Sequence, residues 1–431
     1  MTGPGSDPGR SRREVDVLVI GAGPSGLAAA AALARSGVGR VEVLERESEP
    51  GGIPRHSHHT GYGLRDLHRV MTGPRYACHY AERAAAAGAR VRLAVTATDW
   101  AGPLTFDTTS ATGLEQIAAK AVILATGARE RPRSARLVPG SRPEGVFTTG
   151  LLQQAVYLHQ RSVGRRAVIV GAEHVSFSAA VTLQHAGVDV VAMVTDLPHQ
   201  QSYQAFRIGA ALRYRFPVLT SAHITELLGR PRLTGVRIRH DDGRTAVIDA
   251  DTVVFTGDWI PDNELSRRAG LDMDPGTRGP AVDTRLGTST PGLFAAGNLV
   301  HPVQMADAVA LEGGHVARSV MRWLAGERSP VRTPVVVEGP VRWIAPNRVD
   351  AAGPQPAGGR FVLWPRWFVT RPRVLVCQDA RSLYEGRLRH TLVPNRPAFL
   401  PAGWLREVDP AGGSVSVVVS GNSGTVSTPN R

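Results

Sequence analysis

Three features of the sequence predict an α/β fold with two Rossmann-like dinucleotide-binding domains and a small C-terminal β-rich domain. Two stretches, beginning near residues 15 and 165, each contain a buried apolar strand, a glycine turn and a helix. From about residue 331, short apolar runs alternate with turn residues, which is typical of short strands. A chain of 431 residues is long enough to bury a core in each of these domains.

The first stretch contains a phosphate-binding loop. The strand VDVLVI leads into GAGPSG at 21–26, and an alanine-rich helix follows. Gly21 makes the tight turn, Gly23 leaves room for a pyrophosphate, and Gly26 lets the helix pack closely. Glu45 ends the next strand and is placed to accept hydrogen bonds from ribose hydroxyls. The residues expected to hold this nucleotide are Gly21, Gly23, Pro24, Ser25, Gly26, Glu45, Arg46 and Gly52.

Two later segments, AVILATGA at 121–128 and PGLFAAGN at 291–298, are apolar strands that end in small residues. With the first loop, they resemble the glutathione- and thioredoxin-reductase-like flavoproteins, the pyridine nucleotide-disulfide reductase superfamily, over residues 14–325. ATGARERPR and PEGVFTTG are similar to the flavin subunits of opine oxidase, hydroxyproline dehydrogenase, sarcosine oxidase and hydrogen cyanide synthase. This resemblance implies FAD as the cofactor, with further contacts from Ala125, Thr126, Gly127, Gly297, Asn298, Gln304, Met305 and Ala306.

The sequence departs from this superfamily at two points. Asn298 replaces the acid of the superfamily's Gly-Asp turn, although an amide can still hydrogen-bond a hydroxyl. Cys78 and Cys377 are too few for an iron–sulfur cluster and too far apart in the sequence for a CxxC redox pair. Two isolated cysteines fit a reducing cytoplasm.

The resemblance also implies which side chains lie beside the flavin ring. The stretch after the Gly-Gly pair runs there, so Arg55 and His56 are expected to stabilise negative charge on a reduced flavin. A surface loop that is rich in His by chance is the alternative. A metal site formed by His56, His58 and His59 is a further possibility, although no carboxylate or cysteine is evident nearby.

Three more residues are expected near the reaction. VVFTGDWIPDNEL at 253–265 matches the superfamily's turn back into the FAD domain and brings Asp258 and Trp259 to the flavin edge. For Trp259, packing between domains is the alternative. His301 is expected either on the substrate side or as a packed or capping residue.

The second loop, VIVGAEHVSFSAA at 168–180, keeps one of the three usual glycines. Gly171 makes the tight turn, but Glu173 stands where a pyrophosphate needs bare backbone. Its carboxylate would repel phosphates or cap the helix and take the anion site itself. Like charges ~4 Å apart cost on the order of a few kcal/mol, or about a hundredfold in affinity. Weak or absent nicotinamide binding is therefore expected at Gly171 and Glu173, with NADH favoured over NADPH because no arginine follows Thr195-Asp196.

The domain boundaries follow from these motifs and from composition. The expected parts are tails at 1–13 and 421–431, an FAD-binding domain at 14–160 and 266–330, an NAD(P)-binding-like domain at 161–265, and a β-rich domain at 331–420. The last domain mixes arginines with Trp364, Trp367 and Phe368. That mixture indicates either a docking surface for a partner or a domain core with snorkelling arginines.

The net charge of +13 comes almost entirely from arginine, with Lys120 the only lysine. No basic block with interleaved aromatics lies near a nucleic-acid motif, so nucleic-acid binding is not expected. No apolar run reaches the ~18 residues of a membrane span, and the N-terminus has no secretory h-region.

The expected function is that of a cytoplasmic FAD-dependent oxidoreductase that passes electrons through flavin N5. Its expected partners are a small amine or amino acid as substrate, and a second flavoprotein subunit or a second copy of the chain. The alternatives are a stand-alone NADH-dependent flavin reductase or dehydrogenase and a non-catalytic adenine-nucleotide-binding scaffold subunit.

Overall fold

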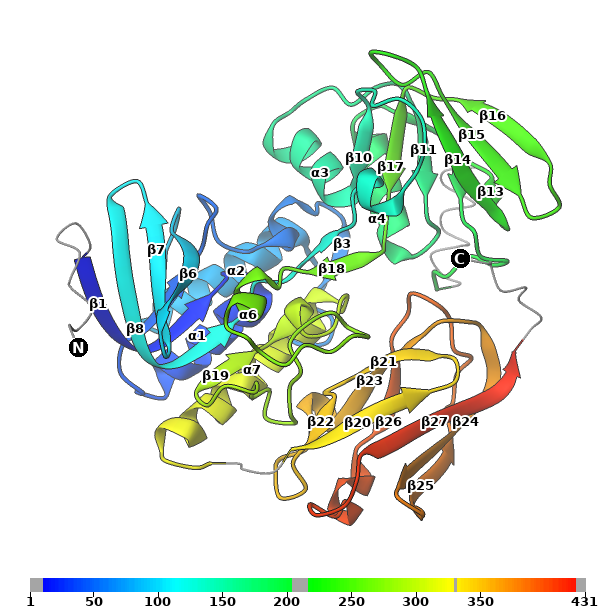
Figure 1. Cartoon of the computed structure of the whole chain (residues 1–431). Helices are drawn as coiled ribbons and strands as arrows, with labels where there is room; N and C mark the ends of the chain where they lie inside the picture. Colours follow the sequence, from blue (N-terminus) through cyan, green and yellow to red (C-terminus); the bar gives the residue numbers. More distant parts are fainter. Residues whose placement is uncertain (1–10, 204–215, 329–331, 424–431) are drawn as a thin grey trace, which may run out of the picture.

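The computed structural model describes residues 11–203, 216–328 and 332–423 and arranges them in three parts, each with its own sheets. The first part comprises 11–127 and 262–328, the second 131–258, and the C-terminal part 332–423. In Figure 1 the first part lies at the left, the second at the upper right and the C-terminal part at the lower right.

The first part is built around a mainly parallel sheet. Its elements are β1 (Ser11–Ile20), α1 (Pro24–Arg35), β2 (Val41–Leu44), η1 (Ile53–His56), β3 (Thr60–Tyr62), β4 (Met71–Thr72), α2 (Gly73–Ala86), β5 (Arg90–Arg92), β6 (Thr96–Gly102), β7 (Thr105–Ser110), β8 (Gly113–Leu124), α6 (Glu264–Arg268), β19 (Leu293–Ala295), η4 (Gly297–Leu299) and α7 (Ala306–Leu324). The strand order is β5-β2-β1-β8-β7-β6, with β19 beside β8. Helices α1 and α7 pack on each other and on the buried apolar residues of β1 and β8.

The second part has a smaller, fully parallel sheet. Its elements are η2 (Arg133–Arg136), β10 (Val146–Thr148), α3 (Thr149–Gln153), the π-helical turn η3 (Gln154–Leu158), β11 (Arg166–Val170), α4 (His174–His185), β12 (Asp189–Val194), β13 (Val218–Leu219), β14 (Ala222–Leu228), β15 (Gly235–His240), β16 (Thr245–Asp249) and β17 (Thr252–Phe255). The parallel order is β10-β17-β11-β12-β13, and β14-β15-β16 form a separate antiparallel sheet. Alternate residues of β11 point into two different hydrophobic cores. Ile169 packs with residues of α4, and Val168 packs with residues of the antiparallel sheet.

Two short strands connect these parts. β9 (Ala128–Glu130) pairs antiparallel with β18 (Trp259–Pro261), where the chain enters and leaves the second part. Ion pairs reinforce this connection, with Arg131 to Asp258 at 2.7 Å and Arg129 to Asp262 at 2.7 Å.

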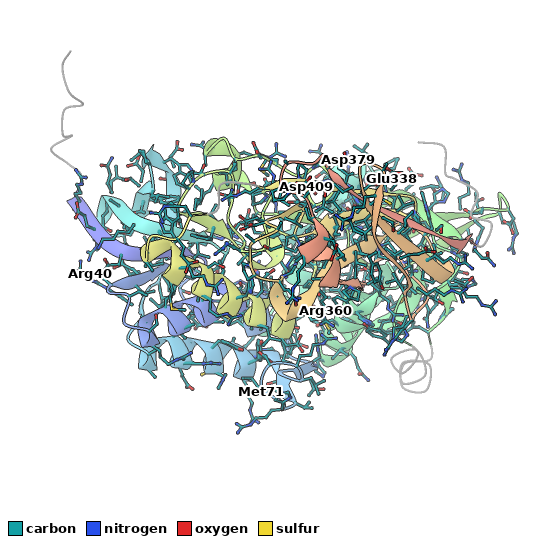
Figure 2. All side chains as sticks on the ribbon, turned by 90° about the horizontal axis from the view of Figure 1, so that it is seen from below. Arg40, Met71, Glu338, Arg360, Asp379 and Asp409 are labelled. Atoms are coloured by element: carbon teal, nitrogen blue, oxygen red, sulfur yellow. The ribbon has the colours of Figure 1, made fainter. Side chains whose placement is uncertain are left out.

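The C-terminal part has two sheets around its own core. Its elements are β20 (Thr333–Glu338), β21 (Val341–Ala345), β22 (Arg348–Val349), η5 (Ala357–Gly359), β23 (Arg360–Pro365), β24 (Val369–Gln378), β25 (Arg381–Arg387), β26 (Ala398–Pro401), η6 (Gly403–Glu407) and β27 (Val415–Ser423). The sheets run β22-β20-β27-β24-β25 and β21-β23-β26. Figure 2 shows Arg360 beside α7, at the boundary with the first part.

Side chains of the C-terminal part enter the core of the first part. Trp343 and Trp364 stack with ring centres 5.2 Å apart and belong to the buried cluster around β1 and β8. The Asn347 side chain accepts a hydrogen bond from the backbone N–H of Val282 at 2.9 Å, and Arg285 pairs with Asp350 at 3.3 Å. Some of the tryptophans and arginines of the C-terminal part therefore pack against the first part of the same chain.

Both expected tail boundaries are wrong by a few residues. β1 begins at Ser11, which pairs with Glu115 of β8, so 11–13 are strand rather than tail. β27 continues to Ser423, so 421–423 are strand as well. In both cases backbone pairing extends the strand beyond its apolar stretch. The remaining tail residues, 1–10 and 424–431, lie outside the described residues.

The expected end of the first segment of the FAD domain at residue 160 is also wrong. β10 pairs in parallel with β17 and so belongs to the sheet of the second part. Helix α3 follows it and contacts α4. The chain therefore passes into the second part directly after β9, near residue 131.

Candidate functional site

The first glycine loop is held by backbone contacts that leave one position open. A Cβ atom on Gly21 would lie 2.4 Å from the carbonyl oxygen of Ala125, and one on Gly26 would lie 2.0 Å from that of Gly21. A Cβ atom on Gly23 would have no neighbour within 4 Å. Gly21 and Gly26 are thus required by the fold, whereas Gly23 faces open space.

Three other predicted turns meet at this loop. The backbone N–H of Ala125 donates to Ile20 O at 2.8 Å. A Cβ atom on Gly52 would lie 3.1 Å from Gly23 Cα, and one on Gly297 would lie 3.0 Å from Ser25 Cβ. The ends of β1, β2, β8 and β19 therefore converge on one site, as the sequence predicts for parallel strands.

The residues at this site fit a dinucleotide. The Ser25 hydroxyl is buried at the start of α1 and has no hydrogen-bond partner in the described part of the chain. It stands beside the open space at Gly23, at the positive end of a 12-residue helix. An anionic pyrophosphate would satisfy this hydroxyl and the first N–H groups of α1.

Glu45 and Arg46 lie at the end of β2. Glu45 is buried, and its carboxylate accepts the backbone N–H of Ala22 at 2.9 Å and that of Glu47 at 3.0 Å. It holds the glycine loop, and each oxygen keeps a lone pair, so a ribose contact stays a prediction. Arg46 pairs with Asp262 at 3.2 Å.

The turn after β19 is fixed by Asn298. Its side-chain oxygen accepts the Gln304 N–H at 2.8 Å, and its amide donates to Gln304 O at 3.3 Å. Asn298 therefore shapes the 298–304 loop. Gln304 is buried, and its side-chain nitrogen has no hydrogen-bond partner among the described residues, while Met305 is exposed and caps α7 ahead of Ala306.

Sequence reasoning missed Glu312, a buried residue of α7. Its carboxylate accepts the Gly297 N–H at 2.6 Å and lies 2.8 Å from Nε2 of His301. Burial disfavours charge on His301, but the adjacent Glu312 raises the pKa of the imidazole overall. His301 thus has a packed, paired position. The signal for Glu312 was its place on the buried stripe that includes Val309 and Val316.

Two of the residues after the Gly-Gly pair, Arg55 and His56, differ in charge from each other. Burial lowers the pKa of His56 to about 4, so the ring is neutral at pH 7, and its stabilising of negative charge on a reduced flavin stays a prediction. Its Nδ1 is buried without a partner among the described residues. Arg55 pairs with Glu47 at 3.4 Å. In the described part of the chain no group of His, Cys, Asp and Glu could hold a metal ion, and His58 stacks on Tyr157.

Asp258 and Trp259 lie at the connection between the two parts. Asp258 has a left-handed backbone (φ 52°) and accepts from Arg131. Trp259 pairs in register with Glu130 and borders a pocket that Pro302 also lines. Their approach to a flavin edge stays a prediction.

In the second loop, the Glu173 side chain turns back into the loop. One carboxylate oxygen accepts the N–H of Ala172 at 3.0 Å and the other accepts the Thr256 hydroxyl at 2.6 Å. A Cβ atom on Gly171 would lie 2.8 Å from this carboxylate. Burial raises the pKa of Glu173. The second loop therefore has a glutamate at the position that Gly23 has in the first loop, and its carboxylate is bonded within the loop.

The chain belongs to the pyridine nucleotide-disulphide oxidoreductase family, whose profile matches residues 15–321. Members of this family are oxidoreductases that bind FAD and use NAD(P)H, so the chain is assigned to the FAD-dependent oxidoreductases.

Individual relatives are moderately similar. An opine oxidase subunit of Agrobacterium tumefaciens is 28% identical over 324 residues, which are 66% of this chain and 61% of that protein. A ferredoxin–NADP reductase of Salinispora arenicola is 30% identical over 324 residues, which are 72% of this chain and 93% of that one. The solved thioredoxin reductase of T. acidophilum is 25% identical with a TM-score of 0.59, and the match covers 72% of this chain and 98% of that one.

Proposed function

We propose that the protein uses FAD to oxidise a small amine or amino acid, alone or with a partner subunit. The observation that supports this proposal is the contrast between the two loops. The first has open space at Gly23 and a Ser25 hydroxyl with no partner among the described residues, whereas the second has a buried carboxylate, that of Glu173, bonded within the loop. From this contrast we infer that the flavin receives its electrons from a substrate other than a nicotinamide.

Bound FAD would supply the group that accepts two electrons from the substrate. Ser25 and the N-terminus of α1 would hold its pyrophosphate, and Gly52 and Gly297 would allow the turns beside this loop to pack closely around it. Gln304 and the first N–H groups of α7 would favour negative charge on a flavin ring bound beside them. Neutral His56 would donate or accept a hydrogen bond there, and Trp259 would border the site from the connection between the first two parts.

Anaerobic reduction of the purified yellow holoprotein tests this function. Flavin absorbance is followed while NADH, NADPH, amines, amino acids and N-alkylated amino acids are added in turn. An amine or amino acid that bleaches the flavin within seconds, with slow or no bleaching by NADH, supports the proposal. Rapid bleaching at micromolar NADH with none by amines makes the protein an NADH-dependent reductase instead. A folded, colourless protein that takes up no FAD would leave only the scaffold alternative.

A partner subunit is part of the same proposal, because the opine oxidase relative is named as one subunit of an enzyme. Within residues 11–203, 216–328 and 332–423, none of the helices combines the length and apolar content of a membrane span. Co-purification from its own host under native conditions, followed by size-exclusion chromatography, separates a heteromer from a homodimer. A cytoplasmic location is the remaining part of the proposal.

A further inference from the structure

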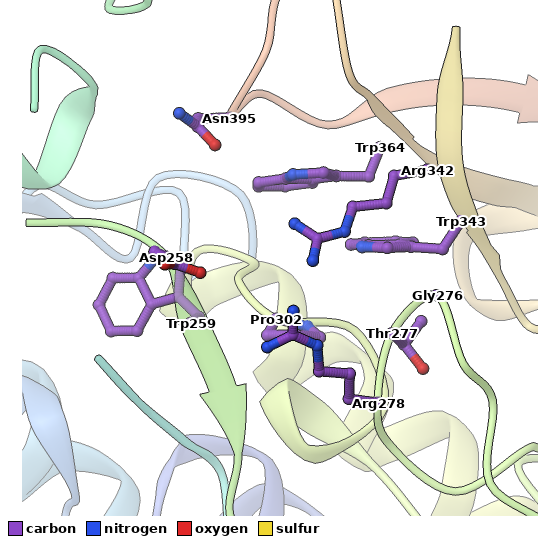
Figure 3. Close-up of a pocket in the computed structure, with 10 residues that line it drawn as sticks. All are labelled: Asp258, Trp259, Gly276, Thr277, Arg278, Pro302, Arg342, Trp343, Trp364 and Asn395. Carbon is purple, nitrogen blue, oxygen red and sulfur yellow. The ribbon is translucent and has the colours of Figure 1, made fainter. Parts of the chain in front are cut away.

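A pocket lies where all three parts of the molecule meet. Trp259 of β18 borders it on one side, Arg278 and Pro302 of the first part on another, and Arg342 and Trp364 of the C-terminal part on a third. Its cavity volume is about 30 Å³, which is room for about two water-sized groups. Figure 3 shows the two arginine side chains directed into the same space, with Trp364 and Trp259 around it.

The charge of this pocket is positive. Arg278 is half-buried and has no ion pair or hydrogen bond from its guanidinium to any described residue. Arg342, also half-buried, brings a second guanidinium to the same space. Asp258 is the one carboxylate among the lining residues, and it already pairs with Arg131 at 2.7 Å. Arg342 already has an interaction of its own, so Arg278 is the guanidinium that an anion in this pocket would pair with, and the second positive charge beside it favours the same anion.

The backbone at this pocket is held in an unfavourable conformation. Arg278, Asp258 and Asn395 all have left-handed backbones, with φ of 63°, 52° and 60°. Asn and Asp tolerate this conformation because their short side chains can hydrogen-bond the local backbone. Arginine has no such compensation. The Arg278 loop is fixed by hydrogen bonds from its N–H to Asp274 O at 2.8 Å and from the Asn263 side chain to its carbonyl. Such strain in a fixed loop points to a residue placed for function.

The walls of the pocket include aromatic side chains that are buried and stacked. Trp343 and Trp364 stack with an interplanar angle of 11°, and both are buried. Asn395 adds a polar side chain at the rim. Stacked rings beside guanidinium groups form a surface for a small molecule with an anionic end and a flat or apolar body.

We propose that this pocket binds the carboxylate of a small organic acid, with Arg278 and Arg342 as its ligands. The pocket reaches Pro302, which lies in the loop between Asn298 and Gln304. Under the proposed function, the site therefore takes a substrate that carries a carboxylate, such as an amino acid or an N-substituted amino acid, rather than a simple amine. This substrate assignment rests on the proposed function, whereas the binding of a carboxylate does not.

The test is a titration of the oxidised holoprotein with benzoate and with its uncharged analogue benzamide. Tryptophan fluorescence and the flavin difference spectrum report binding. Benzoate is expected to bind at least about tenfold more tightly than benzamide, because charge-assisted hydrogen bonds to arginine are strong. Arg278→Gln and Arg342→Gln are each expected to weaken benzoate binding about tenfold or more and to leave benzamide unchanged. Arg278→Lys restores part of the affinity, and Arg366→Gln, at an exposed arginine outside the pocket, has no effect.

Equal binding of benzoate and benzamide, or benzoate affinity that is unchanged in both Gln variants, overturns the proposal. FAD content and the thermal midpoint of each variant confirm that it is folded. Two further results separate this proposal from the proposed function. Arginine-dependent benzoate binding without flavin reduction by any amine or amino acid rejects the function and keeps the pocket. Flavin reduction by an amino acid, with a KM that neither arginine affects, keeps the function and rejects the pocket.

Discussion

At the scale of single residues, two buried glutamates do equivalent work in the two glycine loops. Glu45, from the end of β2, accepts the N–H of Ala22, the residue after the first loop glycine. In the second loop the corresponding N–H, of Ala172, goes to Glu173 of the loop itself. Glu173 therefore replaces an acid from the next strand and places a buried carboxylate within the loop itself, against Thr256.

Replacing Glu173 tests this interpretation. Glu173→Gly removes the carboxylate and reopens the loop, so flavin bleaching by NADH at submillimolar concentration is expected to become at least about tenfold faster. Glu173→Gln is the matched control, since it removes the charge and keeps the side chain in place, and it is expected to gain much less. Stopped-flow absorbance under anaerobic conditions measures both. Unchanged NADH rates in a folded, FAD-loaded Glu173→Gly protein would contradict the self-filled loop.

Glu130 predicts a pH dependence of stability. Burial raises its pKa to about 7, while one oxygen accepts the Gly150 N–H at 2.9 Å. The folded state thus holds a proton that the unfolded state loses above pH ~4.3, so this residue lowers stability as pH rises, up to the folded pKa. Glu130→Gln removes that loss. Relative to wild type, it is expected to gain about 2 kcal/mol in unfolding free energy between pH 5 and pH 8, as measured by urea denaturation. A difference that does not vary with pH would show that Glu130 is ionised when folded.

At the scale of elements, neighbouring glycines of α7 differ in what they touch. A Cβ atom on Gly313 would lie 2.3 Å from Ser25 O of α1, and one on Gly314 would have no neighbour within 4 Å. Gly313→Ala is therefore expected to push α1 away, to lower the thermal midpoint and to weaken FAD binding about tenfold or more through Ser25. Gly314→Ala is expected to stabilise by about 0.5–1 kcal/mol, because alanine favours the helix. Thermal unfolding and FAD dissociation measure both. Equal behaviour of the two variants would refute close helix packing as the reason for Gly313.

The same scale shows what could be predicted from sequence. The turns at Gly21, Ala125 and Gly297 were predictable, because a parallel sheet brings the carboxyl ends of its strands together whatever the side chains. The assignment of β10 was not, because three residues of strand pair with β17 about a hundred positions later. Glu312 was missed for a related reason. Its partners, Gly297 and His301, lie on the other side of a loop, and the conformation of that loop cannot be predicted from the spacing of residues in the sequence.

At the scale of the whole molecule, the C-terminal part contacts both of the others. Trp343 and Trp364 pack into the core of the first part. Toward the second part, Arg396 lies 3.8 Å above the ring of Tyr203, and Phe368 meets His199 edge-on at 5.5 Å. From composition alone, the arginines and aromatic residues of the C-terminal part could form either a partner surface or internal packing, because both use arginine beside aromatic rings. These contacts come close to the start of α4, where His174 also packs on Tyr203.

Trp343 is the residue on which this attachment is expected to depend. It is 3% exposed, stacks on Trp364, and lies so close to Gly276 that a Cβ atom there would be 2.7 Å from Trp343 Cβ. Trp343→Ala removes this packing at a cost of about 3–5 kcal/mol. In calorimetry the wild type is expected to unfold the first and C-terminal parts in one transition, and the variant in two, with the C-terminal part melting first. Trp367→Ala, at a half-buried tryptophan of the same part, is the control and is expected to keep one transition. A single transition at the wild-type midpoint in Trp343→Ala would mean that the polar contacts at Asn347 and Asp350 suffice to join the two parts.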